Sequence, residues 1–325
     1  MPVFSAFIPE VHHKVSPGYV DILIQTRREE LFTGLMQLSH PSNEDLVFSF
    51  VDGVEQKLYR YQENTTEIVP RSAWQQMLSR PETSVGLLSL SLDAMRFMRI
   101  AHEAPVVRME EMKLNSQELV GNVSRWVLDQ DPSIVHIKTD EVDRLYLFAD
   151  RSSSVLEEMS SVEGQWQFSI SNPSFAQTLP EGGYQVVRYV SNREHDAWRE
   201  YELRLTLNPL IRMLMKRFSE LAGRVLTERL SEQLSAWAHG GGWNITLSSN
   251  GVVNRQYFDS LEVAVDAYTD ILRRFQFEAA TAVGSRIVEG ISHDILYKLD
   301  QYRRELLLRY IFSQNGIGGV VVRAQ

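Results

Sequence analysis

The spacing of hydrophobic residues along the chain changes near residue 206. Before that point, short segments alternate apolar and polar residues, as half-buried β-strands do, with short helical segments between them. After it, apolar residues recur every three to four positions, as on one face of an α-helix. The pattern predicts an α+β fold with antiparallel sheets, in three domains. These are a first α/β module over 1–110, a second, related module over 111–206, and a mainly helical domain with a short β-hairpin over 207–325.

The first module contains a predicted β-hairpin that is followed by a tight turn. Asp52 and Gly53 come directly after a β-branched and aromatic run, and this pair is typical of a structural turn after a strand. The predicted order is strand, strand, turn, short helix and alternating strand, at 35–38, 46–51, Asp52–Gly53, 72–78 and 86–92. Predicted helices then follow at 93–102 and 115–129.

The second module repeats this order, which indicates an internal duplication. Its predicted elements are strands at 134–137 and 145–150, a structural turn at Asp150, a short helix at 155–159 and a strand at 164–170. In this alignment, 47–52 lies over 145–150, and 86–92 lies over 164–170. Two further strands are predicted at 184–189 and 200–207, where apolar and polar residues alternate.

A long helix is predicted to open the third domain. Asn208 is a good N-cap and Pro209 suits the first helical position, where its missing N–H costs nothing. The helix is predicted to run to about residue 238, where three glycines stop it. A hairpin then follows, with a strand at 243–247 and a turn at 249–251, and after it helices at 261–275, 277–289 and 291–312 and an edge strand or loose tail at 316–322.

The long helix carries five basic residues that form a candidate interaction face, Arg212, Lys216, Arg217, Arg224 and Arg229. Such a run suits an acidic protein partner or a polyanion. Glutamates are interleaved with it, which favours an ordinary solvated helix face. The whole chain has a formal charge of -9, which makes nucleic acid an unlikely partner.

Composition narrows the chemistry that the chain can perform. The chain has no cysteine, which excludes disulfides, thiolate nucleophiles and thiolate metal sites. The sequence lacks a phosphate-binding loop, a zinc-protease motif and a nucleophile elbow, so no catalytic, cofactor-binding or metal-ligating residue is predicted. The adjacent His12 and His13 fit a polar N-terminal segment better than a zinc site. No run of about 20 apolar residues and no signal peptide is found, so a cytoplasmic location is expected, without a membrane partner.

Four segments of the first module match the motifs of a known family. They are Thr-Gly-Leu-Met-Gln-Leu at 33–38, Leu-Val-Phe-Ser-Phe-Val-Asp-Gly at 46–53, and the segments 73–78 and 86–92. In this order they resemble the first strand motif, the second strand motif, the small helix and the closing strand of the PATAN domain family of bacterial signalling proteins. The resemblance covers about 20–170, with Asp150-Arg151 where the family has Asp-Gly and Pro132-Ser133 where it has Thr-Gly. It implies an adaptor rather than a catalyst, with response regulators or small Ras-like GTPases as partners.

Three functions are open from the sequence. The favoured hypothesis is a non-enzymatic, cytoplasmic bacterial signalling adaptor that presents sheet edges and the long helix to a protein and forms a homo-oligomer. The second is a regulator that binds a ligand or nucleic acid, in a pocket between the modules or at the Arg212–Arg229 face. The third is an enzyme with an acid–base pair in the charged segment Arg193-Glu194-His195-Asp196, which also fits a solvated loop.

Overall fold

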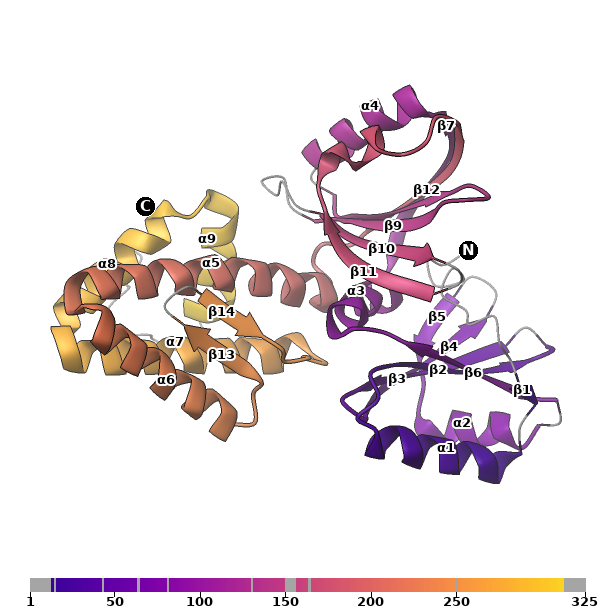
Figure 1. The fold of residues 1–325 in the computed structure, drawn as a ribbon, viewed down its shortest axis with the longest axis horizontal. Coiled ribbons are helices and arrows are strands. Elements are labelled where there is room, and N and C mark those ends of the chain that lie inside the picture. Colours follow the sequence, from indigo (N-terminus) through magenta and orange to yellow (C-terminus); the bar gives the residue numbers. More distant parts are fainter. Residues whose placement is uncertain are drawn as a thin grey trace. The chain divides into compact units, whose positions relative to one another are not determined.

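A computed structural model describes residues 13–14, 16–42, 44–62, 65–80, 82–129, 131–149, 156–162, 165–248 and 251–312. These residues form helices and antiparallel sheets, with a helical C-terminal region, which confirms the predicted α+β fold class. The chain divides into two compact units, and the division falls between Trp198 and Arg199 (Figure 1).

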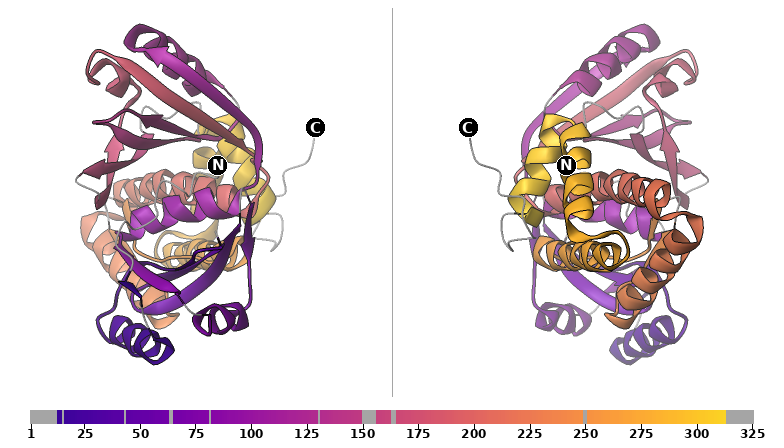
Figure 2. Two further views of the ribbon diagram at one scale, coloured as in Figure 1. Left: turned by 90° about the vertical axis from the view of Figure 1, so that its right-hand side faces the viewer. Right: turned by 90° about the vertical axis from the view of Figure 1, so that its left-hand side faces the viewer.

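The first sheet of the first unit has the strand order β1-β6-β2-β3-β4-β5. Its strands are β1 (His13–Lys14), β2 (Gly34–His40), β3 (Glu44–Val51), β4 (Val54–Gln62), β5 (Thr65–Ile68) and β6 (Ser84–Ser89). Helices α1 (Pro17–Glu29) and α2 (Arg71–Leu78) cover one face, and α3 (Leu92–Glu103) lies on the opposite face (Figures 1 and 2). The core under α1 and α2 includes Trp74 and Phe48, whose ring centroids are 5.1 Å apart.

The second sheet has the strand order β11-β10-β9-β8-β12-β7. Its strands are β7 (Val106–Asn115), β8 (Ser133–Lys138), β9 (Asp143–Phe148), β10 (Leu156–Val162), β11 (Gln165–Ser171) and β12 (Gly183–Ser191). Helix α4 (Ser116–Leu128) and the short helix η2 (Pro173–Gln177) pack on one face. Asn115 and Glu118 form a capping box that fixes the start of α4 directly after β7.

The two sheets share one topology. In each, a strand and a helix precede four strands that pair in chain order, and a short helix and a closing strand follow. The closing strand, β6 or β12, pairs antiparallel with the first strand of the four, β2 or β8, and with the strand before the helix, β1 or β7. A helix, α3 or α5, then continues the chain. The described residues thus carry the same order of elements twice.

The predicted alignment of the two copies is right in part. β3 and β9 hold equivalent places, as predicted from 47–52 and 145–150. The strand equivalent to β6 is β12, however, and not the strand at 164–170. The helix predicted at 155–159 is wrong, because this stretch is part of β10, which pairs with both β9 and β11. Pairing on both sides overrides the helical preference of Leu, Glu and Met.

The turn after β3 is formed by Asp52 and Gly53. Both residues have positive φ, 49° and 76°, between the paired Val51 and Val54, as a two-residue hairpin turn requires. A Cβ on Gly53 would lie 2.5 Å from the backbone oxygen of Arg28, so the turn has no room for a larger residue.

Helix α3 is buried on all sides. It contacts β3 and β5 of the first sheet and β11 of the second, and it lies between the two sheets in Figure 1. Its buried residues include Phe97 and Ile100, but also Arg96, Arg99 and His102. Buried charged groups need partners, and the helix is therefore a site to examine for chemistry.

The second unit is mainly helical. Its elements are α5 (Asp196–Ala222), which begins in the first unit, α6 (Arg224–Gly240), β13 (Ile245–Ser248), β14 (Gly251–Asn254), α7 (Leu261–Val283), α8 (Ser285–Lys298), α9 (Gln301–Leu307) and a π-helical turn η3 (Leu308–Phe312). β13 and β14 pair as a hairpin, as predicted. One core joins the helices to the hairpin, with Phe218 against Phe275 at 6.3 Å between ring centroids.

Two predictions at the start of this unit are wrong. The strand expected at 200–207 is helical, and Pro209 lies inside α5 rather than at its first position. Leu203, Leu207, Leu210 and Leu214 are all buried, and their spacing of three to four residues is the helical one that decides the structure. The expected single helix to residue 238 is divided at Gly223, which has a φ of 84°.

Some predicted boundaries fall inside elements, and some predictions lie outside the described residues. The boundary at 110/111 lies within β7, and that at 206/207 lies within α5. The turn at Asp150, the histidine His12 and the predicted edge strand at 316–322 lie outside the residues that the structure describes. The strands β4, β5 and β7 were not predicted from the sequence.

Candidate functional site

The five basic residues of the predicted interaction face lie on two helices. Arg212, Lys216 and Arg217 belong to α5, and Arg224 and Arg229 belong to α6, beyond the break at Gly223. All five side chains are exposed. The structure therefore does not bring them together as one continuous helix face.

Two of these cations are already used in ion pairs within their own helices. Arg217 donates to Glu220 at 2.6 Å, and this hydrogen bond lowers the pKa of the Glu220 carboxyl. Arg224 donates to Glu228 at 2.6 Å. Arg212, Lys216 and Arg229 form no ion pair with any residue that the structure describes. These three are the cations of the face that remain open to an external anion.

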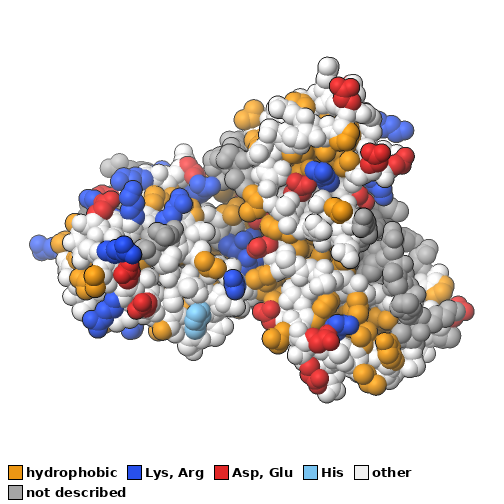
Figure 3. All heavy atoms as spheres, in the orientation of Figure 1, with side chains coloured by type: hydrophobic (Ala, Val, Ile, Leu, Met, Phe, Trp, Pro, Cys, Tyr) orange, Lys and Arg blue, Asp and Glu red, His pale blue; other side chains and the backbone are white. Residues whose placement is uncertain are grey.

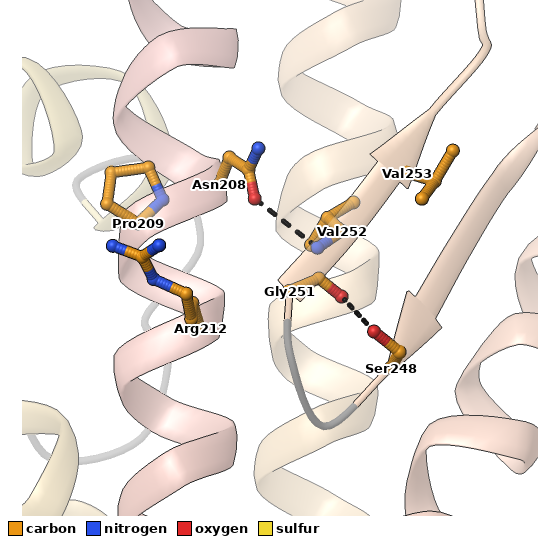
Figure 4. Close-up of a pocket in the computed structure, with 7 residues that line it drawn as sticks. All are labelled: Asn208, Pro209, Arg212, Ser248, Gly251, Val252 and Val253. Carbon is orange, nitrogen blue, oxygen red and sulfur yellow. Dashed lines mark hydrogen bonds between the residues drawn. The ribbon is translucent and has the colours of Figure 1, made fainter.

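Arg212 lines a pocket between α5 and the β13–β14 hairpin. The cavity has a volume of about 340 Å³, and its lining residues are Asn208, Pro209, Arg212, Ser248, Gly251, Val252 and Val253. The Asn208 side chain points from α5 to the hairpin, where its Oδ1 accepts a hydrogen bond from the Val252 N–H at 3.3 Å (Figure 4). The Arg212 guanidinium lies beside Pro209 in the same view. Because Oδ1 is the acceptor, the Asn208 amide and the Arg212 guanidinium offer N–H donors to a carboxylate or phosphate.

Large apolar side chains are exposed around the junction of α5 and α6. Leu221, Val225 and Leu226 are 49%, 77% and 44% exposed. Gly223, with a φ of 84°, separates Leu221 on α5 from Val225 and Leu226 on α6. None of the three side chains belongs to the hydrophobic core of the second unit. Figure 3 shows hydrophobic side chains among basic and acidic ones on the second unit. We call Leu221, Val225 and Leu226 the elbow patch.

Strand β7 is an edge of the second sheet. It pairs with β12 on one side, and its other side has no strand among the described residues. Val107 and Met109 are 64% and 46% exposed, and Glu111 and Lys113 are also exposed. A long edge strand with open backbone N–H and C=O groups is a surface on which another strand can add.

A buried polar network lies between α3 and β4. Glu103 Oε1 accepts hydrogen bonds from Lys57 Nζ at 2.8 Å and from the Tyr59 hydroxyl at 2.9 Å. Glu103 Oε2 accepts from Arg99 Nε at 3.3 Å. The Glu103 and Arg99 side chains are only 6% and 3% exposed. Each charge therefore has an opposite charge beside it, as burial in a domain core requires.

His102 packs beside this network, against two tyrosine rings. Its ring centroid is 4.8 Å from that of Tyr59 and 5.7 Å from that of Tyr61. Burial lowers the pKa of His102 to about 3, so the imidazole is neutral at physiological pH. Burial also raises the pKa of the Tyr61 hydroxyl. Groups whose pKa lies far from 7 are poor proton donors and acceptors at neutral pH. The shifted pKa values therefore favour a structural role for the network.

The segment Arg193–Asp196 forms the turn that starts α5. The His195 Nδ1 accepts a hydrogen bond from the Ala197 N–H at 3.3 Å, and Arg193 donates to the Ala149 carbonyl. Burial lowers the pKa of His195. His195 thus contacts the backbone at the start of α5, and Arg193 contacts the backbone directly after β9, in a segment where the sequence had left open an acid–base pair.

Within the described part of the chain, no three His, Cys, Asp or Glu side chains are grouped so that they could hold a metal ion. None of the helices in that part is both long enough and apolar enough to cross a bilayer.

Comparisons with known proteins give little further information. No family model and no curated protein matches the chain. Part of it is similar to the crystal structure of a "Putative DNA polymerase III beta subunit" from Eubacterium rectale, at 14% sequence identity and a TM-score of 0.13. The match covers 57% of this chain and 66% of that one, so the chain spans less than two thirds of that protein. At this TM-score the likeness carries no argument about fold or function.

Proposed function

We propose that the protein is a non-enzymatic adaptor of bacterial signalling that acts in the cytoplasm by binding another protein and by self-association. The observation that carries the proposal is the elbow patch. Leu221, Val225 and Leu226 are exposed, and the ion pairs Arg217–Glu220 and Arg224–Glu228 lie beside them. An apolar centre with a charged rim is the usual composition of a protein interface.

The partner is a protein with an apolar surface of its own. The similarity of 20–170 to PATAN-domain proteins supports an adaptor, and a response regulator or a small GTPase is the partner class that we propose from it. The buried network around Glu103 supports a role without catalysis, because its charges are paired in the core. The ion pairs on α5 and α6 leave few open cations for nucleic acid.

The elbow patch can be tested by affinity capture of the tagged full chain from its native lysate. Val225→Asp places a charge in the patch on a side chain that is 77% exposed, so the fold is expected to persist. The amount of partner protein captured by this variant should be at least tenfold lower than the amount captured by the wild type. The matched control is Ile22→Asp on α1, which is 65% exposed and far from the patch in the sequence. Equal capture by both variants and the wild type would contradict the proposal.

A second candidate function is the binding of a small anionic ligand in the pocket at Arg212. The observation that favours it is that Arg212 forms no ion pair among the described residues and lines a cavity of about 340 Å³. Titration with inorganic phosphate and with a small dicarboxylate should show saturable binding that Arg212→Gln abolishes and Arg229→Gln leaves unchanged. Equal weak binding by all three proteins would exclude the pocket as a site.

A further inference from the structure

The edge of β7 that faces away from β12 carries charges without an ion-pair partner among the residues that the structure describes. Glu111 and Lys113 are exposed and lie on the same face of the strand, because side chains two residues apart do so. Neither forms an ion pair with any residue that the structure describes. Arg108 and Glu110, in contrast, already pair with each other at 2.9 Å, and Glu110 is also 3.6 Å from Arg188. The open charges are therefore near the C-terminal end of β7.

The C-terminal part of β7 pairs regularly with β12, and some of its side chains extend the core under α4. Pairing with β12 runs without a shift from Arg108 to Asn115, and its only irregularity lies at Val107. Met112 and Leu114 are half-buried, and they extend the core under α4 to the sheet edge. A strand added at this edge would complete the burial of both side chains.

We propose that this strand is β7 of a second copy of the chain, paired antiparallel about a two-fold axis at Met112. The proposal deepens the self-association that is part of the proposed function, and it rests on that part. In an antiparallel pair about such an axis, opposite residues lie on the same face, so their numbers differ by an even number. With Met112 opposite itself, Glu111 of each copy faces Lys113 of the other, and Glu110 faces Leu114.

Other registers are less favourable. An axis at Arg108, Glu110 or Glu111 places identical charges directly opposite each other, which is destabilising. An axis at Met109 pairs Arg108 with Glu110 but includes the irregularity at Val107 and uses charges that are already paired. The axis at Met112 pairs residues 109–115 of both copies along the regular part of the strand and joins the two sheets into one. Two-fold pairing also closes, so it gives a dimer rather than a fibre.

Charge exchange tests both the pairing and its register in the full chain. Glu111→Lys places lysine opposite lysine, and Lys113→Glu places glutamate opposite glutamate, so each variant alone should dimerise roughly tenfold more weakly or not at all. An equimolar mixture of the two variants should form a heterodimer, since every pair is then of opposite charge. The double variant with both exchanges should regain the wild-type dimer. The measurement is the molar mass by light scattering after size exclusion, over a range of concentrations.

The control is Arg108→Glu on the same strand, which should leave the dimer intact. Loss of the dimer in this variant alone would overturn the register at Met112. A wild-type chain that stays monomeric at all concentrations, or a mixture that fails to associate, would overturn the self-pairing. A monomer whose partner capture is lost in Glu111→Lys would show that the edge takes a strand of another protein. None of these results bears on Val225→Asp, so the elbow patch is judged separately.

Discussion

Glu103 is the residue on which the buried network of the first unit depends. Its carboxylate faces Lys57 and Arg99 as well as the Tyr59 hydroxyl, in a place where the Glu103 side chain is 6% exposed. Removal of this carboxylate would take away a negative charge that faces two cations. Removal of one partner of a buried ion pair is costly, whereas the pair as a whole adds little.

Glu103→Ala should lower the free energy of unfolding by about 3 kcal/mol. The control is Glu220→Ala, which removes an exposed partner of Arg217 and should leave the free energy of unfolding nearly unchanged. Urea denaturation of both variants measures the difference. Similar losses in the two variants would show that the Glu103 network contributes no more than a surface pair.

His102 should make the stability of the chain depend on pH. Its pKa is about 3 in the folded chain and 6.5 in the unfolded chain, so the unfolded state binds more protons between these values. Its contribution is therefore complete above pH 6.5 and is lost as the pH falls toward 3. Between pH 7.5 and pH 5, His102 should account for a loss of roughly 2 kcal/mol.

His102→Phe should remove this part of the pH dependence, because the ring can no longer take up a proton. Urea midpoints at pH 7.5 and pH 5 give the comparison with the wild type. The exposed His293→Phe is the control and should keep the wild-type dependence. If His102→Phe loses as much stability on acidification as the wild type, the assigned cause is wrong.

At the scale of elements, the first sheet needs glycine at positions where strands approach too closely for a side chain. A Cβ on Gly34 would lie 2.1 Å from the Leu88 backbone oxygen, and Gly34 has a φ of 151°. Gly121, in contrast, lies inside α4 with nothing near its Cβ position. The same substitution should therefore have opposite effects at the two positions.

Gly34→Ala should destabilise the fold by several kcal/mol or prevent it, because the clash is with backbone atoms of the paired strand. Gly121→Ala should raise the free energy of unfolding by about 0.5–1 kcal/mol, since glycine disfavours a helix interior. Thermal denaturation distinguishes the two. A stable Gly34→Ala variant would contradict the close approach of β2 and β6.

The sequence predicted elements whose pattern is local. The hairpin of β2 and β3 and helices α2, α3 and α4 follow from alternation, capping and breaking residues near them. The prediction from sequence was wrong where pairing between distant segments determines the structure. The residues of β10 favour a helix locally, but this segment pairs with β9 on one side and β11 on the other. The prediction was also wrong at 200–207. The leucines there fit both the two-residue period of a strand and the 3.6-residue period of a helix, and only the rest of α5 distinguishes the two.

One signal in the sequence could have corrected the alignment of the two copies. Asp93-Ala94-Met95-Arg96 and Asp196-Ala197-Trp198-Arg199 share three of four residues, and they open α3 and α5 at equivalent places after the closing strands. Aligning the copies on these segments places β6 over β12. The elbow patch could not be predicted, because the sequence around Gly223 fits one continuous helix as well as two helices with a break between them.

At the scale of the whole molecule, the chain combines a repeated sheet unit with a helical unit. The open surfaces described here are the elbow patch on the second unit and the β7 edge on the first. Buried charges of the first unit are paired, among them Glu103 with Lys57, Arg188 with Asp129, and Glu158 with Arg144. Exposed apolar patches mark interaction sites, and the elbow patch therefore supports the proposed binding of a protein partner.

The most direct test of this account is site-specific photocrosslinking of the full chain in its native cell. A photoreactive phenylalanine analogue at position 225 lies in the elbow patch, and one at position 22 samples a side chain of similar exposure on α1. We predict crosslinks from position 225 to one recurring protein, and none to that protein from position 22. Crosslinks from neither position, or the same set of proteins from both, would contradict an adaptor that binds its partner through this patch.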